Sequence, residues 1–419
     1  MGALREQKDI VMPISQPPLD TPDQRWVERL ALRILGDRSL AVVGESVAQH
    51  WIAQITPDEA QLGQFELELE RAVFCGLMNT ANADPRRPLI HAFGRLEHEV
   101  DGKTVPATRT AHTNLDYVYR FVPLDGASSL HIRGRVHDGQ APLAIEYALL
   151  TAGQVYQKTL ALADIAISSD GTFDIYVDGE EAGDRQNHFQ VDQDSYQLLL
   201  RDVIGDPRSQ LPLDLEIVRA APLPDPASIE LPVLDATAQA HIQKHVDDLI
   251  FTTRNFAMAG LANQFGDPAI NKTGIYSASQ AYSIGHVRLD RDEAMIITLT
   301  LGSAAYATVP LTNIWGGVGE ILAVRSNVST PLATRNGDGS FTFVISLTDP
   351  GTYNWVEIGP DGTGCLFMRW VGLTDGVAPE MSASIVHLDN WRPPAELVRN
   401  GRPDGGKDLR REGYCRVMA

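Results

Sequence analysis

The chain has 419 residues and a formal net charge of −19, and this length predicts about three domains rather than one. Hydrophobic residues make up 43% of the chain and charged residues 21%, as in an ordinary globular protein. The excess of acidic side chains would repel phosphate groups, which disfavours binding to nucleic acid or to a membrane surface. No run approaches the roughly 18 apolar residues of a spanning helix, and the charged start of the chain does not resemble a signal peptide. We therefore expect a cytoplasmic protein.

The three cysteines, Cys75, Cys365 and Cys415, are far apart and show no paired metal-ligand spacing. Because their number is odd, a secreted disulfide framework does not account for them. Reduced thiols are the expectation.

Residues 1–108 carry helix signals after a proline-containing leader. Thr21-Pro22-Asp23-Gln24 has the form of a capping box with proline at the first helical position. A second box, Thr56-Pro57-Asp58-Glu59, predicts the start of a longer helix. We predict a helical N-terminal region over these 108 residues.

Residues 109–222 change to β-rich runs that alternate with turn signals, for example at 117–121, 130–136 and 173–177. Short strands at roughly 8–12-residue spacing indicate a sandwich or barrel. Residues 223–273 then contain a proline-rich linker and an amphipathic helix that begins at Asp235. A second region of β-rich runs and turn signals covers residues 274–396, and residues 397–419 form a basic tail.

A spaced motif occurs twice in the two β-rich regions. The second copy has Asp338-Gly339, then Asn354-Trp355, then Arg369, and the first has Asp170-Gly171, then Asn187-His188, then Arg201. The interval between the aspartate and the arginine is the same in both copies. This pattern predicts two similar β modules.

The second copy resembles the bacterial family called domain of unknown function 1214, whose C-terminal module reads Asp-Gly, a β run, Asp-Pro-Gly, Asn-Trp and then Arg. The matching residues here are Asp338-Gly339, Asp349-Pro350-Gly351, Asn354-Trp355 and Arg369. The resemblance covers residues 275–395 well and residues 110–220 more loosely. It implies tandem jelly-roll-like modules, similar in outline to double jelly-roll capsid proteins, and supplies no catalytic residues because the biochemical role of the family is largely unassigned. His188 stands where the family has the tryptophan, so a site that uses this tryptophan would be absent from the first module.

The fold class expected from these patterns is mainly β. Two tandem jelly-roll-like β-sandwich modules are preceded by a helical N-terminal region.

One candidate site lies on the strand predicted at 130–136, where alternation places basic side chains on one face. A small-molecule pocket needs aromatic side chains that bury the ligand and fixed hydrogen-bond donors that orient it. The candidate catalytic residues are His131, Arg133 and Tyr119, and the candidate ligand-binding residues are Arg120 and Arg135. The alternative is that this face is simply solvated.

A second candidate site is the motif loop with Asn354, Trp355 and Arg369, in which the tryptophan would stack on a ligand and the arginine would meet its polar end. The alternative interpretation is structural. Asn354 would tie down the loop backbone, Trp355 would fill the core, and Arg369 would pair with Asp338 or Asp349.

His241 and His245 lie one helical turn apart, with Asp248 three residues further on, a spacing that can bring metal ligands to one helix face. No glutamate follows His241 as in His-Glu-x-x-His, so the zinc-protease pattern fails. A solvated helix edge is the favoured interpretation, and we predict neither a metal nor another cofactor.

Two function classes follow from these patterns. In the first, the protein is an enzyme that acts on a hydrophobic small molecule, such as a terpenoid, steroid or aromatic catabolite. The reaction would be hydrolysis, hydration or elimination without a redox cofactor, since no redox-cofactor motif is visible. The alternative is a non-catalytic glycan-binding or self-assembling capsid-like jelly-roll protein. The expected partners are a small-molecule ligand and further copies of the chain in a homo-oligomer.

Overall fold

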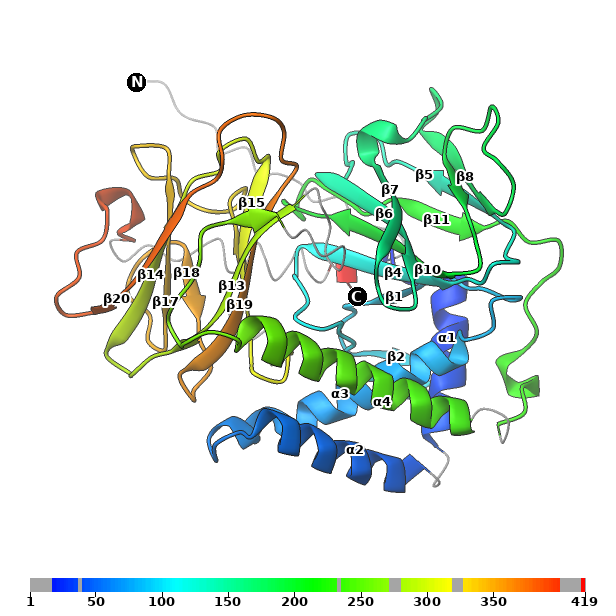
Figure 1. The fold of residues 1–419 in the computed structure, drawn as a ribbon, viewed down its shortest axis with the longest axis horizontal. Helices are drawn as coiled ribbons and strands as arrows, with labels where there is room; N and C mark the ends of the chain where they lie inside the picture. Colours follow the sequence, from blue (N-terminus) through cyan, green and yellow to red (C-terminus); the bar gives the residue numbers. More distant parts are fainter. Residues whose placement is uncertain are drawn as a thin grey trace.

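A computed structural model describes residues 17–36, 40–231, 235–270, 280–318, 327–399 and 416–418. The fold is mainly β, with two sandwiches side by side and a layer of helices that runs beneath both (Figure 1). The predicted fold class is therefore confirmed. Among the described helices, none is long and apolar enough to cross a membrane.

The helical layer contains α1 (Pro22–Leu35), α2 (Leu40–Ile55), α3 (Phe65–Ala81) and α4 (Asp235–Thr252). α1 begins where the first capping box predicts, since the Thr21 side chain accepts a hydrogen bond of 3.1 Å from the Gln24 N–H.

The helix start expected at the second capping box is wrong. Thr56 has a positive φ of 52° and its hydroxyl donates to the Ile55 carbonyl. The Asp58 carboxylate instead accepts from the Gln61 N–H at 3.0 Å, and the short 3₁₀ turn Gln61–Gln64 intervenes before α3.

The first sandwich consists of a five-stranded and a four-stranded sheet. The five-stranded sheet has the order β1 (His91–Phe93), β4 (Tyr117–Pro123), β10 (Ser195–Val203), β6 (Ala144–Thr151) and β7 (Tyr156–Ala161). The four-stranded sheet has the order β11 (Asp214–Ile217), β5 (Leu130–Arg135), β8 (Thr172–Asp178) and β9 (His188–Gln190). β1 thus comes from the region expected to be helical, as does the small hairpin of β2 (His98–Val100) and β3 (Lys103–Val105).

The second sandwich also pairs a five-stranded with a four-stranded sheet. The first has the order β12 (Ala269–Ile270), β13 (Gln280–Arg288), β19 (Thr363–Val371), β15 (Tyr306–Thr312) and β16 (Asn327–Ser329). The second has the order β18 (Trp355–Glu357), β17 (Phe341–Ser346), β14 (Glu293–Leu299) and β20 (Met381–His387).

The two sandwiches have corresponding strand orders. The strands correspond one to one in chain order, from β4 with β13 to β11 with β20, and each pair occupies the same place in its sheet. β1 corresponds to β12. The pairs β8–β9 and β17–β18 are both parallel. The glycines of the two Asp-Gly turns, Gly171 and Gly339, lead into β8 and β17 with φ of 81° and 90°, a conformation that favours glycine.

Alternation along the central strands divides their side chains between two environments. On β10, Leu198 and Leu200 point into the first sandwich, and on β19, Met368 and Trp370 point into the second. The outward face of β19, which includes Phe367, turns toward the helical layer. Leu199, on the outward face of β10, belongs to a separate cluster that also contains Tyr306 of the second sandwich.

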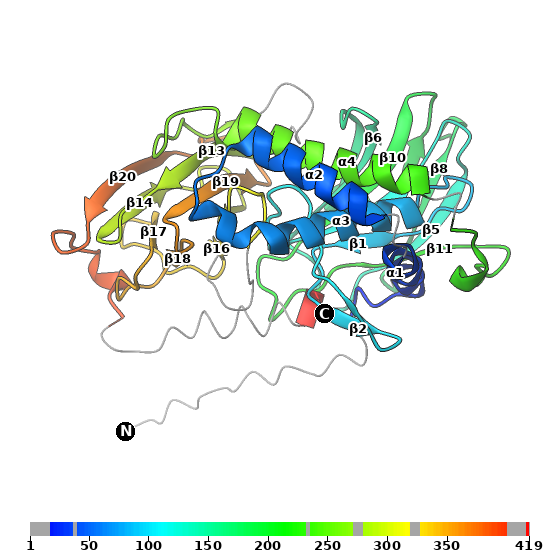
Figure 2. The ribbon, with the colours of Figure 1, turned by 90° about the horizontal axis from the view of Figure 1, so that it is seen from below.

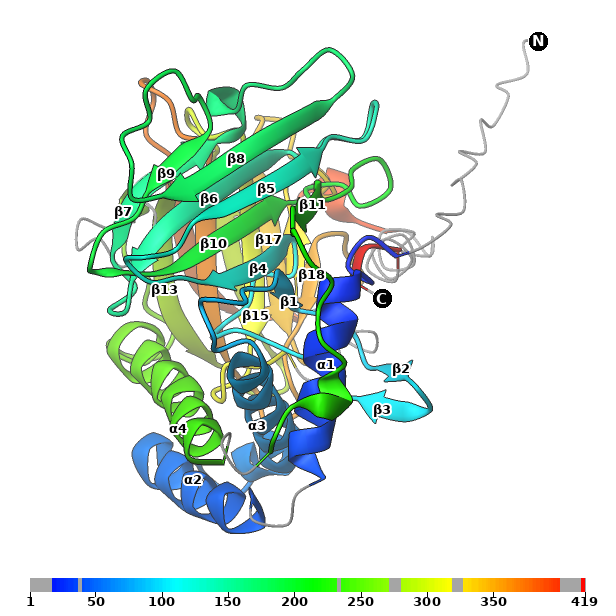
Figure 3. The same ribbon diagram turned by 90° about the vertical axis from the view of Figure 1, so that its right-hand side faces the viewer.

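The helix predicted after the proline linker belongs to this layer. Its apolar residues Ile242, Val246 and Leu249 are buried against α3, and the two helices approach so closely at Gly76 that a Cβ there would lie 2.5 Å from the Ile242 Cα. Figure 2 and Figure 3 show α2, α3 and α4 running together across the lower side of the sandwiches. Most of the predicted basic tail lies outside the described residues, except that Val417 and Met418 pack near Leu19.

Candidate functional site

A cavity of about 680 Å³ lies between the outward face of the first five-stranded sheet, the helices α3 and α4, and the neighbouring edge of the second sandwich. Aromatic rings make up much of its wall. They are Phe93, Tyr119, Phe121, Tyr156, Tyr196, Phe251, Phe256 and Tyr282. This is the size and lining typical of a small-molecule site.

Cross-strand pairing arranges the floor of the cavity in two rows. One row contains His91, Phe121 and Leu199, and the other contains Phe93, Tyr119 and Arg201. Each row crosses from β1 through β4 to β10, so the histidine and the arginine lie at opposite ends of an aromatic floor.

The charged end is built around Arg201, which forms a buried ion pair with Glu146 on the next strand, β6. The Tyr156 hydroxyl donates to Glu146 Oε1 at 3.1 Å, and Gln280 Nε2 donates to Glu146 Oε2 at 3.1 Å. Because Gln280 belongs to β13, the second sandwich helps to hold this carboxylate.

Arg369 on β19 brings a second guanidinium to the same end of the cavity. Its Cζ lies 5.5 Å from the centroid of the Tyr117 ring, and that of Arg201 lies 5.2 Å from it. Burial raises the pKa of Tyr117 above its ordinary value, so the ring beside these two positive charges is a neutral phenol.

The other end of the cavity carries three histidines, His91, His241 and His245. The His91 ring lies 5.0 Å from the Phe93 ring, and the His245 ring lies 6.1 Å from the same ring. Burial lowers the pKa of His91 to about 4 and also lowers the pKa of His241, to which the nearby charge of Lys244 adds. Both imidazoles are therefore neutral near pH 7.

His91 is held in place because side chains of α1 form hydrogen bonds with the backbone on both sides of it. Asp23 Oδ2 accepts from the Ile90 N–H at 3.0 Å, and Gln24 Oε1 accepts from the Ala92 N–H at 2.6 Å. Gln24 is oriented in turn, since its Nε2 donates to Glu28 Oε1 at 2.8 Å.

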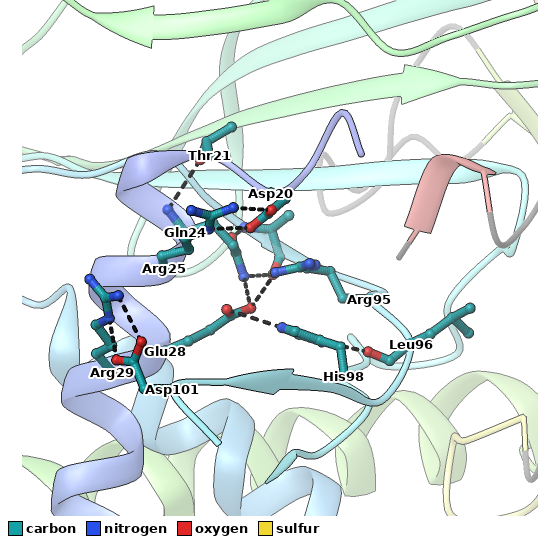
Figure 4. A network of polar contacts seen from close by, with 11 residues as sticks. Asp20, Thr21, Gln24, Arg25, Glu28, Arg29, Arg95, Leu96, His98 and Asp101 are labelled. Atoms are coloured by element: carbon teal, nitrogen blue, oxygen red, sulfur yellow. Dashed lines mark hydrogen bonds and ion pairs between the residues drawn. The ribbon is translucent and has the colours of Figure 1, made fainter. Parts of the chain in front are cut away.

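Figure 4 shows the polar network that continues from Gln24. Arg95 Nη1 lies 2.7 Å from Glu28 Oε1, and His98 Nε2 lies 3.1 Å from Glu28 Oε2. Burial by itself raises the pKa of Glu28, but the hydrogen bond from His98 and the charge of Arg95 outweigh it and leave the pKa below its ordinary value. A buried, charged anchor thus supports the strand that carries His91.

The structure separates the residues of the first predicted site. Tyr119 lies in the cavity, whereas Arg120 points to the opposite side of β4, where its Nη1 donates to the Leu213 carbonyl at 2.6 Å and its other nitrogen pairs with Asp202. His131, Arg133 and Arg135 are on β5 of the other sheet and do not line the cavity.

The β5 residues meet acidic neighbours on an outward face. His131 Nε2 lies 2.6 Å from Asp174 Oδ1, and its ring stacks on Tyr176 at 4.9 Å. Arg133 lies 3.8 Å from Asp174 and is about half exposed. This is the solvated arrangement that was the alternative for this strand.

The second predicted site is also divided. Arg369 lines the cavity, but Asn354 and Trp355 lie at the other sheet of the second sandwich. Asn354 has a positive φ of 56° and bonds the Thr334 N–H and C=O at 2.7 Å each, so it ties down the loop. Trp355 is 8% exposed.

The carboxylates proposed as partners of Arg369 have other contacts. Asp349 pairs with Arg399, and Asp338 Oδ1 accepts from the Ser340 N–H at 2.9 Å.

The helix set His241, His245 and Asp248 lines the cavity, but Asp248 is paired with Lys244 Nζ at 2.8 Å. Within the described residues, no three His, Cys, Asp or Glu side chains are grouped so as to hold a metal ion.

Sequence reasoning missed His91 and Tyr282 as cavity residues, and Glu146 as the buried partner of the cavity arginine Arg201. Glu146 left a signal, because a charged residue interrupts the apolar run at 144–150. His91 left none, since only the fold brings β1 beside β4.

No protein-family model matches the sequence, and no curated protein sequence matches it. Among solved structures, the chain is similar to an uncharacterized protein from Burkholderia cenocepacia, with a TM-score of 0.67 and 21% identity over 86% of this chain and 100% of that chain. A protein from Vibrio parahaemolyticus matches with a TM-score of 0.38 and 12% identity over 65% of this chain and 90% of that chain. The Burkholderia structure supports the fold.

Proposed function

We propose that the cavity binds an amphipathic small molecule with a ring system, and that the chain transforms it by hydrolysis, hydration or elimination without a redox cofactor. The observation that carries this proposal is the lining of the cavity, which has an aromatic floor with arginines at one end and neutral histidines at the other. Rings would pack on the floor, and the two ends would fix the orientation.

The size of the cavity favours a fused-ring or similarly elongated molecule. β1 and β10 are two strand spacings apart, which is about 10 Å. A terpenoid, steroid or bicyclic aromatic compound spans such a distance.

The charged end favours a carboxylate or another polar oxygen on the ligand. A guanidinium binds a carboxylate through two parallel N–H donors, and the neighbouring tyrosine rings exclude water from the contact. Arg201 and Arg369 would share this task.

The alternative of a glycan-binding or assembly protein would use shallow aromatic faces. The aromatic rings described above instead surround a cavity with a floor and a helical cover, which favours the small-molecule interpretation. Homo-oligomer formation and a cytoplasmic location remain expectations from the sequence.

We also propose that the two sandwiches are an internal repeat, and that the chain is related to domain of unknown function 1214. The corresponding strand orders support the first proposal. The Asp-Gly, Asn-Trp and Arg motifs support the second.

The proposal is tested by filling the cavity. Leu199 is 6% exposed and lies on β10 beside Phe121 in the floor, so Leu199→Trp should block binding while the sandwich core behind it stays unchanged. Ile167→Trp adds the same side chain at an exposed position outside the cavity lining and serves as the control.

Binding is measured by calorimetry with 2-naphthylacetate and a panel of polycyclic carboxylates, and small molecules released from the purified protein are identified by mass spectrometry. Wild type and the control should bind a member of the panel, and Leu199→Trp should bind it at least tenfold more weakly. Equal affinity in all three proteins, or no binding of any panel member together with no released ligand, would contradict the proposal.

A further inference from the structure

The tautomer of His91 is fixed by its neighbour Asn82. Asn82 Oδ1 accepts from the Leu89 N–H at 3.0 Å, and Nδ2 donates to the Leu89 carbonyl at 2.8 Å, so the orientation of this amide is set on both sides. The same Nδ2 lies 2.8 Å from His91 Nδ1. An amide N–H₂ is only a donor, so Nδ1 must be the acceptor and the proton of the neutral ring must lie on Nε2.

The Nε2–H of His91 is a buried donor that lacks a hydrogen-bond partner within the described part of the chain. The residue is 3% exposed and lines the cavity. A buried donor without a partner costs free energy, and native structures keep such groups where a ligand or water completes them. The hydrogen bonds from the Ile90 and Ala92 N–H groups to α1 fix the backbone of β1, so the strand cannot rotate to give this donor another partner.

His241 has the opposite tautomer. Its Nδ1 lies 3.1 Å from the Thr80 hydroxyl, and that hydroxyl already donates its single hydrogen to the Gly76 carbonyl at 2.9 Å. Thr80 must therefore accept from His241 Nδ1–H, which leaves a lone pair on His241 Nε2. His241 is partly exposed and lines the same cavity.

We propose that His91 and His241 form a donor–base pair for a ligand with a carbonyl group, in which His91 Nε2–H donates to the carbonyl oxygen and His241 Nε2 removes a proton from the adjacent carbon. The proposal rests on the proposed function, and it names the substrate class as enolisable carbonyl compounds. Thr80 and Asn82 come from the end of α3 and the residue that follows it, so one segment orients both imidazoles.

The step is a proton transfer that needs no further reactant. The C–H bond next to the carbonyl breaks and a new N–H bond forms on His241. The electron pair of the C–H bond becomes a carbon–carbon double bond, and the carbonyl π electrons move to the oxygen, which is now an enolate held by His91. Return of a proton to carbon restores both groups, and departure of a leaving group from the next carbon gives an elimination.

A neutral imidazole suits the task of each group. The low pKa of His91 keeps its ring neutral, so it stabilises the oxygen as a donor without losing its proton. The lowered pKa of His241 keeps its lone pair available at neutral pH.

The two tautomers are measured directly by nitrogen NMR of protein labelled at histidine, with the signals assigned from the single variants. We expect the proton of His91 on Nε2 and that of His241 on Nδ1. The reverse tautomer at either residue would overturn the proposal.

Proton transfer is measured with the bicyclic ketone 2-tetralone in D₂O, by following deuterium exchange next to its carbonyl. His241→Gln should slow the exchange catalysed by the protein by about 100-fold or more, because it removes the base. His91→Asn keeps an acceptor for Asn82 but removes the cavity donor, and it should slow exchange by about 100-fold. His91→Gln keeps a donor near the Nε2 position and should retain most of the rate.

His131→Gln is the control, since His131 lies on the outward face of β5, and its exchange rate should equal that of wild type. Binding of 2-tetralone is followed in parallel by saturation-transfer NMR. Absence of binding to wild type would contradict the proposed function and the inference with it. Binding without catalysed exchange, or exchange that is unchanged in His91→Asn and His241→Gln, would contradict the donor–base pair alone.

Discussion

Arg201 and Arg369 occupy the same position in corresponding strands of the two sandwiches. Each is the third residue from the end of a nine-residue central strand, and each lies across from a tyrosine, Tyr119 or Tyr282, on the neighbouring strand. Both guanidinium groups approach the ring of Tyr117. The charged end of the cavity is therefore a product of both modules, and neither sandwich builds it alone.

The buried pair of Arg201 and Glu146 gives the first prediction. Arg201→Met leaves Glu146, which is 4% exposed, without its guanidinium, and it should lower the free energy of unfolding by about 3–5 kcal/mol. The double variant with Glu146→Leu should recover most of this loss, because no buried charge is left uncompensated. Urea unfolding of wild type, both single variants and the double variant gives a double-mutant cycle. Strictly additive losses of unfolding free energy would contradict the expected coupling.

Acid sensitivity follows in part from two buried histidines, His91 and His112. Burial lowers the pKa of His91 to about 4 and that of His112, which is stacked on Phe367, to about 3. The unfolded chain binds these two protons near pH 6.5 and the folded chain does not, so stability falls as the pH is lowered below 6.5.

From these two residues, the free energy of unfolding should decrease by about 2.7 kcal/mol per pH unit between about pH 5.5 and 4.5. Urea titrations at a series of pH values measure this slope. His91→Asn should remove about half of this contribution, and a slope identical to that of wild type would show that His91 is protonated in the folded chain.

The outward face of β5 should be dispensable for ligand binding. His131 and Arg133 meet Asp174 in partly solvated contacts, which contribute about 0–1 kcal/mol at an exposed site. His131→Ala and Arg133→Ala should leave the affinity for a cavity ligand unchanged and the melting temperature within a few degrees of wild type. A tenfold loss of affinity in either variant would return this face to consideration as the site.

Trp355 should stabilise the second sandwich without affecting the cavity. It is buried, its Nε1 donates to the Ser346 carbonyl at 3.3 Å, and it is absent from the cavity lining. Trp355→Ala should cost about 3–5 kcal/mol in unfolding free energy, and Trp355→Phe should cost less. Calorimetric titration of Trp355→Phe should give the wild-type affinity, and lost binding in a stably folded variant would identify the tryptophan as a ligand contact.

The sandwiches were predictable because their signals are local. The alternation of side chains along β10 and β19 and the Asp-Gly turns before β8 and β17 can each be read from a few consecutive residues. The cap of α1 is equally local, since Thr21 and Gln24 are three residues apart. The second capping box failed because Asp58, and not Thr56, supplies the acceptor for the turn that follows.

The cavity was not predictable in the same way, because its parts meet only through the fold. His91 comes from a three-residue edge strand, Arg201 and Arg369 from different sandwiches, and His241 from the helix after the linker. The basic side chains that are close together on β5 lie on a face that does not line the cavity. Arg369 and Tyr119, which the sequence patterns placed in two different candidate sites, both line the cavity.

The central claim is that the cavity between β1 and β10 is the ligand site, and a crystal structure of the chain grown with 2-naphthylacetate tests it most directly. The account predicts electron density for the rings over Phe121 and Leu199, with the carboxylate toward Arg201 and Arg369. Density for the ligand on the outward face of β5, with the cavity filled only by water, would contradict it.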